Sequence, residues 1–451
     1  MNLRRGMLGI LVALTVLAAP TVSWLSSDVA AAHRSRDGEE DDYAESCDSR
    51  KGEEFCSGQV IVRLKSGVMI EGFLAALLEE DDIAATVLDS ILLQSIYLLD
   101  VTTEDNEEDI IHMIEEIEDD EGTSLVSWAE LNYVGNSPAG NPSRFFPRSL
   151  ADPQPAQDGD SWGKQDVRAS AAAQCKTGNG VTVAVIDTGA DVSHAMLSSH
   201  IAGAWNAFSQ LPGQVMDVGD GIDNDGDGFA DETAGHGTHV SGIVLQVAPN
   251  ATVMPIKALD SDGNGNAFIV ARAIFHAADA GANVINLSLG TTAPSKALRN
   301  AVDYAQQHGV IVVAAAGNSG VGGAAEYPAK LAGVISVGAT NAKGKPAAST
   351  RRAPVGFNTT SSEIDISAPG MEIKSAFPTG VQDVTPGFAS WSRTSMAAPW
   401  VSGAIALLVE QHAGITADQA IATIGQTANP IKKVRGMGAG RLNAAAAIGC
   451  S

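Results

Sequence analysis

The sequence predicts an α/β fold in which a mostly parallel sheet lies between layers of helices, preceded by a small α+β unit. Three observations lead to this prediction. After Trp162, short and nearly continuous apolar runs alternate with longer amphipathic stretches, as in parallel sheets covered on both faces. Between residues 59 and 134, strand-like segments flank a helix-like acidic stretch. Five prolines between residues 135 and 160 separate these two units.

The larger unit contains five apolar runs of strand length: VTVAVID, ATVMPIKAL, VINLSL, VIVVAAAG and VISVGAT. Helical periodicity is present at residues 268 to 280 and 295 to 308. Ligand sites in parallel sheets form just beyond the carboxyl ends of the strands. Asp187, Ser288 and Asn318 each follow one of the predicted strands, so we expect them at one edge of the sheet.

Composition divides the chain into five segments. A charged stretch without apolar periodicity precedes the first strand-like pattern, VIVRL, and the last strand-like pattern of the small unit is SLVSWAELNYV. Exposed linkers rich in Pro, Gly and Ser are where proteolytic cuts fall. We expect a signal peptide at residues 1–32, an acidic spacer at 33–58, the small α+β unit at 59–135, a linker with a processing site at 136–160, and the α/β unit at 161–451.

The N-terminus is typical of a secretory signal. Arg4 and Arg5 precede an apolar stretch from residue 7 to 19, and small residues follow at Ala30, Ala31 and Ala32. The apolar stretch is shorter than the roughly 20 residues that cross a bilayer. An uncleaved membrane anchor that continues to Leu25 is the alternative. The sequence therefore predicts a secreted protein that is soluble once the signal has been removed.

The net charge of −25 comes mainly from the first 150 residues, which hold 29 acidic and 10 basic residues. With no Lys/Arg cluster, the chain lacks the basic surface that binds phosphate backbones. Nucleic acid is therefore excluded as an expected partner.

The four cysteines, Cys47, Cys56, Cys175 and Cys450, suit an oxidising compartment and allow three pairings. We favour Cys47 with Cys56 and Cys175 with Cys450, because a cut between residues 56 and 175 then leaves each bridge in one fragment. Four free thiols are the alternative.

Three stretches carry the parts of a nucleophilic site. A serine hydroxyl needs a base to take its proton, a carboxylate to orient that base, and donors for the developing oxyanion. VIDTGADVSH places Asp187 at the end of a strand, GHGTHVSG places His236 between glycines, and SRTSMAAP places Ser395 at the opening of a helix. His194 and His239 in the same stretches are expected to pack or to orient loops.

These stretches, in the order Asp, His, Ser, resemble the signature segments of subtilisin-like serine proteases, the subtilases. The resemblance covers about residues 160 to 448 and continues through NLSLG, AAGNSG, YPA, SVGAT, ISAPG and GAGRLNAAAA. It implies the subtilisin-like three-layer fold and a serine endopeptidase that cleaves extended polypeptide through an acyl-enzyme. More loosely, residues 59 to 135 resemble the propeptide that assists folding and blocks the cleft of a subtilase zymogen; an unrelated accessory domain is the alternative.

The resemblance also implies residue roles. Asp187 would orient the imidazole, His236 would act as general base and then acid, Ser395 would attack, and Asn318 would donate to the oxyanion together with the Ser395 backbone N–H. Two segments resemble the walls of the primary specificity pocket and one resembles the edge that pairs with substrate. The wall residues are Ser288, Leu289 and Gly290 with Ala315, Ala316 and Gly317, and the edge residues are Gly263 and Gly265. These small and apolar segments predict some apolar preference.

The acidic stretch DGIDNDGDGFADE predicts a structural calcium site. It spaces Asp223, Asp225 and Asp227 at alternate positions and adds Asp231, and hard cations such as Ca²⁺ prefer oxygen ligands of this kind. Position 12 of an EF-hand would be Ala234, so the sequence predicts an isolated loop. A solvated loop without an ion is the alternative. No cofactor is expected for catalysis.

Two features depart from the family pattern. Arg393 stands two residues before Ser395, where the family usually has glycine, and a side chain there would be strained if the backbone needs a positive φ. The connection after His236 is short, so the calcium loop often found there is expected to be missing. Arg393 also motivates the alternative functions of a catalytically impaired binding protein or a calcium-stabilised surface protein. Otherwise we expect a monomeric, self-processed zymogen whose partners are polypeptide substrates and its own propeptide.

Overall fold

The computed structural model describes residues 55–81, 83–102, 107–119, 122–136, 154–155, 161–223, 229–320, 322–347, 359–378, 387–431 and 434–450. The predicted signal segment and most of the spacer and linker lie outside these residues. Among the described residues, no helix combines the length and apolarity needed to cross a bilayer.

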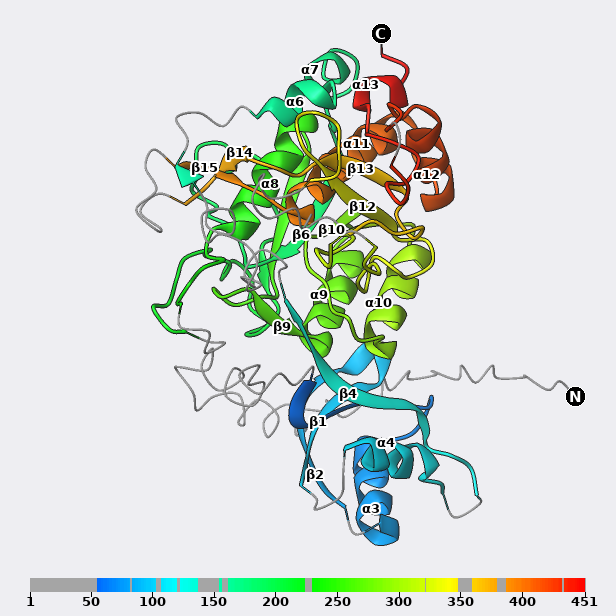
Figure 1. Ribbon diagram of the computed structural model, residues 1–451. Helices are drawn as coiled ribbons and strands as arrows, with labels where there is room; N and C mark the ends of the chain where they lie inside the picture. The colour runs from blue at the N-terminus through cyan, green and yellow to red at the C-terminus, as the bar shows by residue number, and fades with distance from the viewer. Residues whose placement is uncertain are drawn as a thin grey trace, which may run out of the picture. The chain divides into compact units, whose positions relative to one another are not determined.

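A seven-stranded sheet forms the centre of the larger unit (Figure 1). Its strands are all parallel and follow the order β13-β12-β11-β10-β6-β8-β7. Their bounds are β6 Thr182–Asp187, β7 Trp205–Asn206, β8 Thr252–Lys257, β10 Val284–Leu287, β11 Ile311–Ala315, β12 Ile335–Thr340 and β13 Ile366–Pro369. All five predicted strands are present, and their apolar runs are buried on both faces.

Helices cover this sheet in two pairs. Helices α8 (His236–Val247) and α11 (Ala398–Gln411) pack against each other and against the sheet, as do α9 (Ala267–Asp279) and α10 (Lys296–Gln307). The short helices α6 (Trp162–Asp166), α7 (Ala169–Ala172), α12 (Ala417–Gln426) and α13 (Ala444–Ala447) complete the unit. The predicted three-layer α/β fold is confirmed.

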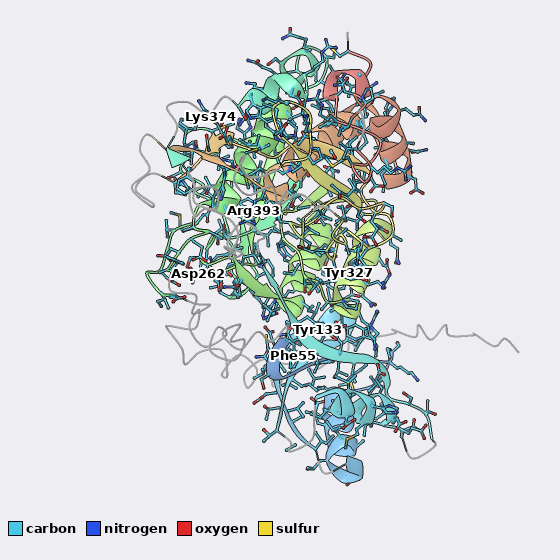
Figure 2. The ribbon with its side chains drawn as sticks, viewed as in Figure 1. Phe55, Tyr133, Asp262, Tyr327, Lys374 and Arg393 are labelled. Carbon is cyan, nitrogen blue, oxygen red and sulfur yellow. A yellow bond between two sulfur atoms is a disulfide. The ribbon has the colours of Figure 1, made fainter. Side chains whose placement is uncertain are left out.

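Residues 55 to 136 form an antiparallel sheet, β2-β3-β1-β4, which β9 of the larger unit extends. Its elements are β1 Phe55–Leu64, α3 Ile70–Asp81, β2 Ala84–Ile91, η2 Leu92–Gln94, β3 Ile96–Thr102, α4 Glu107–Glu116 and β4 Val126–Asn136. Strand β1 begins four residues before the expected boundary at residue 59, and Phe55 lies opposite Tyr133 of β4 (Figure 2). The apolar alternation of VIVRL marks only the second half of β1.

A third, three-stranded sheet has the order β14-β15-β5. Its strands are β14 Ile373–Ala376, β15 Phe388–Trp391 and β5 Gln154–Pro155. Because β5 pairs with β15, the chain rejoins the larger unit at Gln154.

A disulfide joins Cys175 to Cys450, as expected for that pair. Cys56 is also disulfide-bonded, and its expected partner Cys47 lies outside the described residues. The alternative of four free thiols is wrong.

Candidate active site

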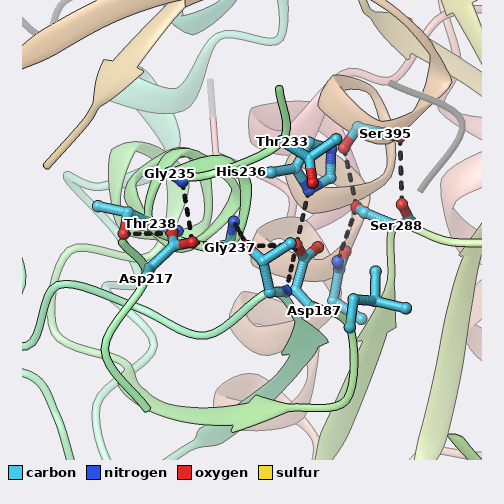
Figure 3. Close-up of polar contacts among 12 residues, drawn as sticks. Asp187, Asp217, Thr233, Gly235, His236, Gly237, Thr238, Ser288 and Ser395 are labelled. Atoms are coloured by element: carbon cyan, nitrogen blue, oxygen red, sulfur yellow. Dashed lines mark hydrogen bonds and ion pairs between the residues drawn. The ribbon is translucent and has the colours of Figure 1, made fainter. Parts of the chain in front are cut away.

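Asp187 and His236 form a fully buried pair (Figure 3). Asp187 ends β6, and His236 begins α8. Their Oδ1 and Nδ1 atoms lie 2.6 Å apart, and Asp187 Oδ1 also accepts a hydrogen bond from the Thr188 N–H at 2.8 Å. Because a carboxylate only accepts hydrogen bonds, Nδ1 carries a proton and Nε2 is left as the basic nitrogen.

The glycines around His236 allow this close approach. Gly235 has φ +92°, which suits glycine. A Cβ atom on Gly237 would lie 2.1 Å from the carbonyl oxygen of Gly189. The sequence GHG is therefore required for α8 to begin directly against the turn that follows Asp187.

Asp217, which the sequence analysis missed, ties this turn to α8. It is 1% exposed. Its Oδ1 accepts hydrogen bonds from Thr188 Oγ1 at 2.7 Å and from the Gly235 N–H at 2.9 Å. Its Oδ2 accepts from the Thr238 N–H at 2.8 Å and from Thr238 Oγ1 at 2.6 Å. One buried carboxylate thus holds both sides of the Asp187–His236 pair (Figure 3).

Ser395 lies in a 3-10 turn, η4 (Thr394–Met396), which precedes α11. The sequence placed Ser395 at the opening of the helix, and α11 begins three residues later, at Ala398. The turn contacts α8, which begins with His236, and Figure 3 labels both residues. Ser395 Oγ donates to the Ser288 carbonyl oxygen at 3.2 Å, while Ser288 Oγ donates to the Ser395 carbonyl oxygen at 2.9 Å.

Asn318 presents a buried donor next to this turn. Its Oδ1 accepts hydrogen bonds from the N–H and the Oγ1 of Thr394, each at 3.2 Å. Its Nδ2 is buried and has no hydrogen-bond partner among the described residues. Because a buried donor without an acceptor is costly, this amide suits a site that receives an acceptor from a ligand.

The segments predicted to contact substrate lie at the carboxyl ends of two strands of the central sheet and at β9. Residues 288 to 290 follow β10, and residues 315 to 317 lie at the end of β11, its neighbour in the sheet. Gly265 lies in β9 (Asn264–Asn266), and Gly263 directly precedes it. Strand β4 pairs with β9, so that Val134 lies opposite Asn266 and Gly135 lies opposite Gly265.

The two histidines that were expected to orient loops bond to backbone groups. His239 Nε2 lies 3.0 Å from the Ile373 carbonyl oxygen and 3.2 Å from that of Ala389. His194 Nε2 lies 2.8 Å from the Gly387 carbonyl oxygen. Burial, together with the charge of His236, lowers the pKa of His239 to about 3, so this ring is neutral and links α8 to β14 and β15.

Arg393 has the positive φ that the sequence comparison indicated. Its φ is 129° and its ψ is 179°, a region that costs a non-glycine residue about 1–3 kcal/mol. The side chain is buried, and burial lowers the pKa of Arg393 to about 10, while the charge of Glu326 raises it.

Of the acidic loop, the structure describes Asp223 and Asp231, whereas Asp225 and Asp227 lie outside the described residues. Asp231 Oδ1 accepts from the Asp220 N–H at 2.8 Å, and Oδ2 accepts from the Gly221 N–H at 3.0 Å. This carboxylate closes the base of the loop. Within the described ranges, no group of three His, Cys, Asp or Glu residues is arranged to hold a metal ion.

The larger unit is similar to known proteins. Residues 178–443 match the model of the subtilase family. The chain is 36% identical over 301 residues to thermitase of Thermoactinomyces vulgaris, covering 64% of this chain and 95% of thermitase. It is 35% identical over 299 residues to subtilisin E of Bacillus subtilis strain 168, covering 63% and 70%.

Among solved structures, fervidolysin of Fervidobacterium pennivorans, described as a keratinolytic enzyme related to subtilisin, aligns with a TM-score of 0.68. The alignment covers 88% of this chain and 61% of that one at 23% identity, which supports the fold alone. A protease of Pseudoalteromonas arctica aligns with a TM-score of 0.56 at 28% identity, covering 63% and 93%.

Proposed function

Since the chain belongs to the subtilase family of serine endopeptidases, we propose that Ser395 is its nucleophile, His236 its base and Asp187 the residue that orients the base. The observation that carries this assignment is the buried 2.6 Å contact between Asp187 and His236, at a helix that touches the turn holding Ser395. The substrates are polypeptides.

The proton movements follow from the hydrogen bonds. Asp187 accepts from Nδ1–H of His236, so Nε2 can take the proton of Ser395 as the hydroxyl attacks the scissile carbonyl carbon. The hydroxyl must first leave the Ser288 carbonyl oxygen, to which it donates in this structure. The protonated ring then gives the proton to the leaving amine, and water hydrolyses the acyl-enzyme by the reverse sequence of transfers.

The oxyanion that forms during attack needs preorganised donors. We assign this role to Asn318 Nδ2 and the backbone N–H of Ser395. Thr394 holds the amide oxygen of Asn318 through two hydrogen bonds, which leaves Nδ2 as the available donor. The amide is therefore oriented before substrate arrives, so little reorganisation is needed in the transition state.

The nucleophile assignment is tested with the secreted full chain and a serine-directed fluorophosphonate. We expect the reagent to add to Ser395 and to no residue of Ser395→Ala, while Ser209→Ala, which removes an exposed hydroxyl, labels like the wild type. Mass analysis of the labelled peptides gives the site. Absence of labelling in the processed wild type would favour the catalytically impaired binding protein.

We propose that residues 55 to 136 act as an inhibitory propeptide of a secreted, self-processed and monomeric zymogen. The support is the pairing of β4 with β9, the edge expected to bind substrate, together with the signal-like N-terminus. Because β4 ends at Asn136 and β5 begins at Gln154, we expect the cut between residues 137 and 153. N-terminal sequencing of the secreted wild type and Ser395→Ala tests this, and an intact wild-type chain would contradict it.

We also propose that Ca²⁺ stabilises the loop of residues 220 to 232. The donor set is rich in carboxylates, which this cation prefers, and Asp231 already draws the base of the loop together. Asp223, Asp225 and Asp227 would supply further ligands, and the ion would have no part in the chemistry. We expect EGTA to lower the Tm of Ser395→Ala, and to do so less when Asp223→Asn is added; an unchanged Tm in EGTA would contradict the site.

A further inference from the structure

The carboxyl group of Glu326, which the sequence did not single out, lies between residues 288–290 and 315–317, the segments that resemble the walls of the primary specificity pocket. The backbone of its segment is fixed to both walls. The Glu326 N–H donates to the Ala316 carbonyl oxygen at 3.1 Å, and Tyr327 exchanges two 2.8 Å hydrogen bonds with Thr291. The segment therefore joins the ends of the two walls. Figure 2 labels Tyr327 in this segment.

The two wall glycines make room for this side chain. A Cβ atom on Gly317 would lie 2.4 Å from Glu326 Oε1, and a Cβ atom on Gly290 would lie 2.6 Å from Glu326 Oε2. Each carboxylate oxygen thus lies against one wall, in space that any larger residue at either glycine would fill. The carboxyl group of Glu326 therefore lies between two segments that the sequence describes as small and apolar.

The carboxylate keeps unused capacity to accept hydrogen bonds. Oε1 receives two long contacts, from the Asn318 N–H at 3.3 Å and from Ser319 Oγ at 3.4 Å. Within the described part of the chain, no donor bonds to Oε2 and no ion pair includes this carboxylate. Burial raises the pKa of Glu326, and the charge of Arg393 lowers it. Arg393 thus favours the ionised form without forming an ion pair with it.

We propose that Glu326 is a specificity residue that selects a lysine or arginine side chain at the position P1, the substrate residue whose carbonyl is attacked. The N–H groups of a cationic side chain that enters between the two walls would supply the donors that the carboxylate lacks. An acidic P1 residue would be repelled. This inference rests on the proposed function and deepens it.

The test uses the processed enzyme from the full chain and peptides that differ only at P1, as Lys, Arg, Leu, Phe, Ala or Glu. Reactive enzyme is first titrated with fluorophosphonate. We expect kcat/KM for Lys and Arg to exceed that for Leu and Phe at least about tenfold, since a charge-assisted hydrogen bond contributes roughly 10- to 100-fold. Glu326→Gln should remove this advantage, whereas Glu363→Gln, which changes an exposed carboxylate near the pocket, should leave the ranking intact.

The outcomes separate the two proposals. Enzyme that is labelled but prefers Leu and Phe, or prefers Ala because Glu326 merely shortens the pocket, overturns this inference and leaves the nucleophile assignment standing. Wild-type enzyme that is not labelled overturns both. Because the P1 ranking of the wild type decides the question by itself, a Glu326→Gln variant that fails to fold does not prevent an answer.

Discussion

The two units of the chain use their buried polar groups differently. In the larger unit, a broad apolar core surrounds the parallel sheet, and Asp187 and Asp217 are buried to hold groups of the same unit. The smaller unit has a far smaller core, and its β4 directs Glu130 and Asn132 at the larger unit. Glu130 accepts from the N–H of Ala297, and Asn132 accepts from that of Phe268, at the starts of α10 and α9.

The buried polar groups of the larger unit therefore position the candidate catalytic residues, whereas those of the smaller unit hold it against the larger one. Small cores provide little stability of their own, so contacts such as the ion pair between Asp89 and Arg272 matter more to the smaller unit. Changes in the larger unit should therefore alter catalytic rate, and changes in the smaller one should alter latency.

The largest effect is expected from Asn318→Ala. Removing one oxyanion donor costs about 10²- to 10³-fold in kcat, while KM should change little because the donor acts mainly in the transition state. Steady-state kinetics of fluorophosphonate-titrated enzyme measure this. A change confined to KM would show that Asn318 binds substrate without stabilising the oxyanion.

Asp217→Asn should lower kcat by roughly 10- to 100-fold, because an amide cannot accept all four hydrogen bonds that the carboxylate receives. As a positioning residue, Asp217 acts through His236, so the pH dependence of kcat/KM should also shift. The exposed Asp303→Asn provides the control. If Asp217→Asn loses only thermal stability and keeps its pH profile, the residue has a structural role alone.

Glu130→Gln should shorten the lag before activity appears, by about tenfold or more, since an amide replaces a buried carboxyl group that accepts hydrogen bonds from Ser295, Lys296 and Ala297. Glu115→Gln is the matched control, because Glu115 contacts the side chain of Lys296 in a largely exposed pair, worth about 0–1 kcal/mol. Equal lags in both variants would contradict the view that β4 attaches the smaller unit.

The last prediction concerns acid stability. His239 has its pKa lowered to about 3 from 6.5, so between these values the unfolded chain binds a proton that the folded chain does not. The free energy of unfolding should therefore decrease as the pH is lowered below 6.5, by up to about 1.4 kcal/mol per pH unit. In a Ser395→Ala background, His239→Gln should show a shallower fall of Tm than the exposed control His412→Gln. If Tm depends on pH in the same way in both variants, His239 does not cause the loss of stability in acid.

The strands of the larger unit could be predicted because each is a continuous apolar run, and Asp187 could be predicted because it ends one. Arg393 could be singled out because the family usually has glycine at this position, and its φ of 129° is the positive value that glycine would favour. Helix α3 was missed, and so was β13, which is only four residues long.

Asp217 and Glu326 could not be predicted, since neither follows a strand or belongs to a motif. Asp217 bonds to a residue that is distant in the sequence, Thr188, 29 residues away. The only available signal for Glu326 was an acidic residue in a run of small residues directly before YPA.

The bridge between Cys175 and Cys450 has a consequence for a protease that shares its solution with copies of itself. A terminal segment that detaches from the folded unit becomes extended, and extended polypeptide is the form that a protease binds as substrate. Here the disulfide, with the ion pair between Arg441 and Asp166, ties the C-terminal residues to the opening helices of the larger unit. Neither end can detach alone, so we expect reduction to hasten self-digestion.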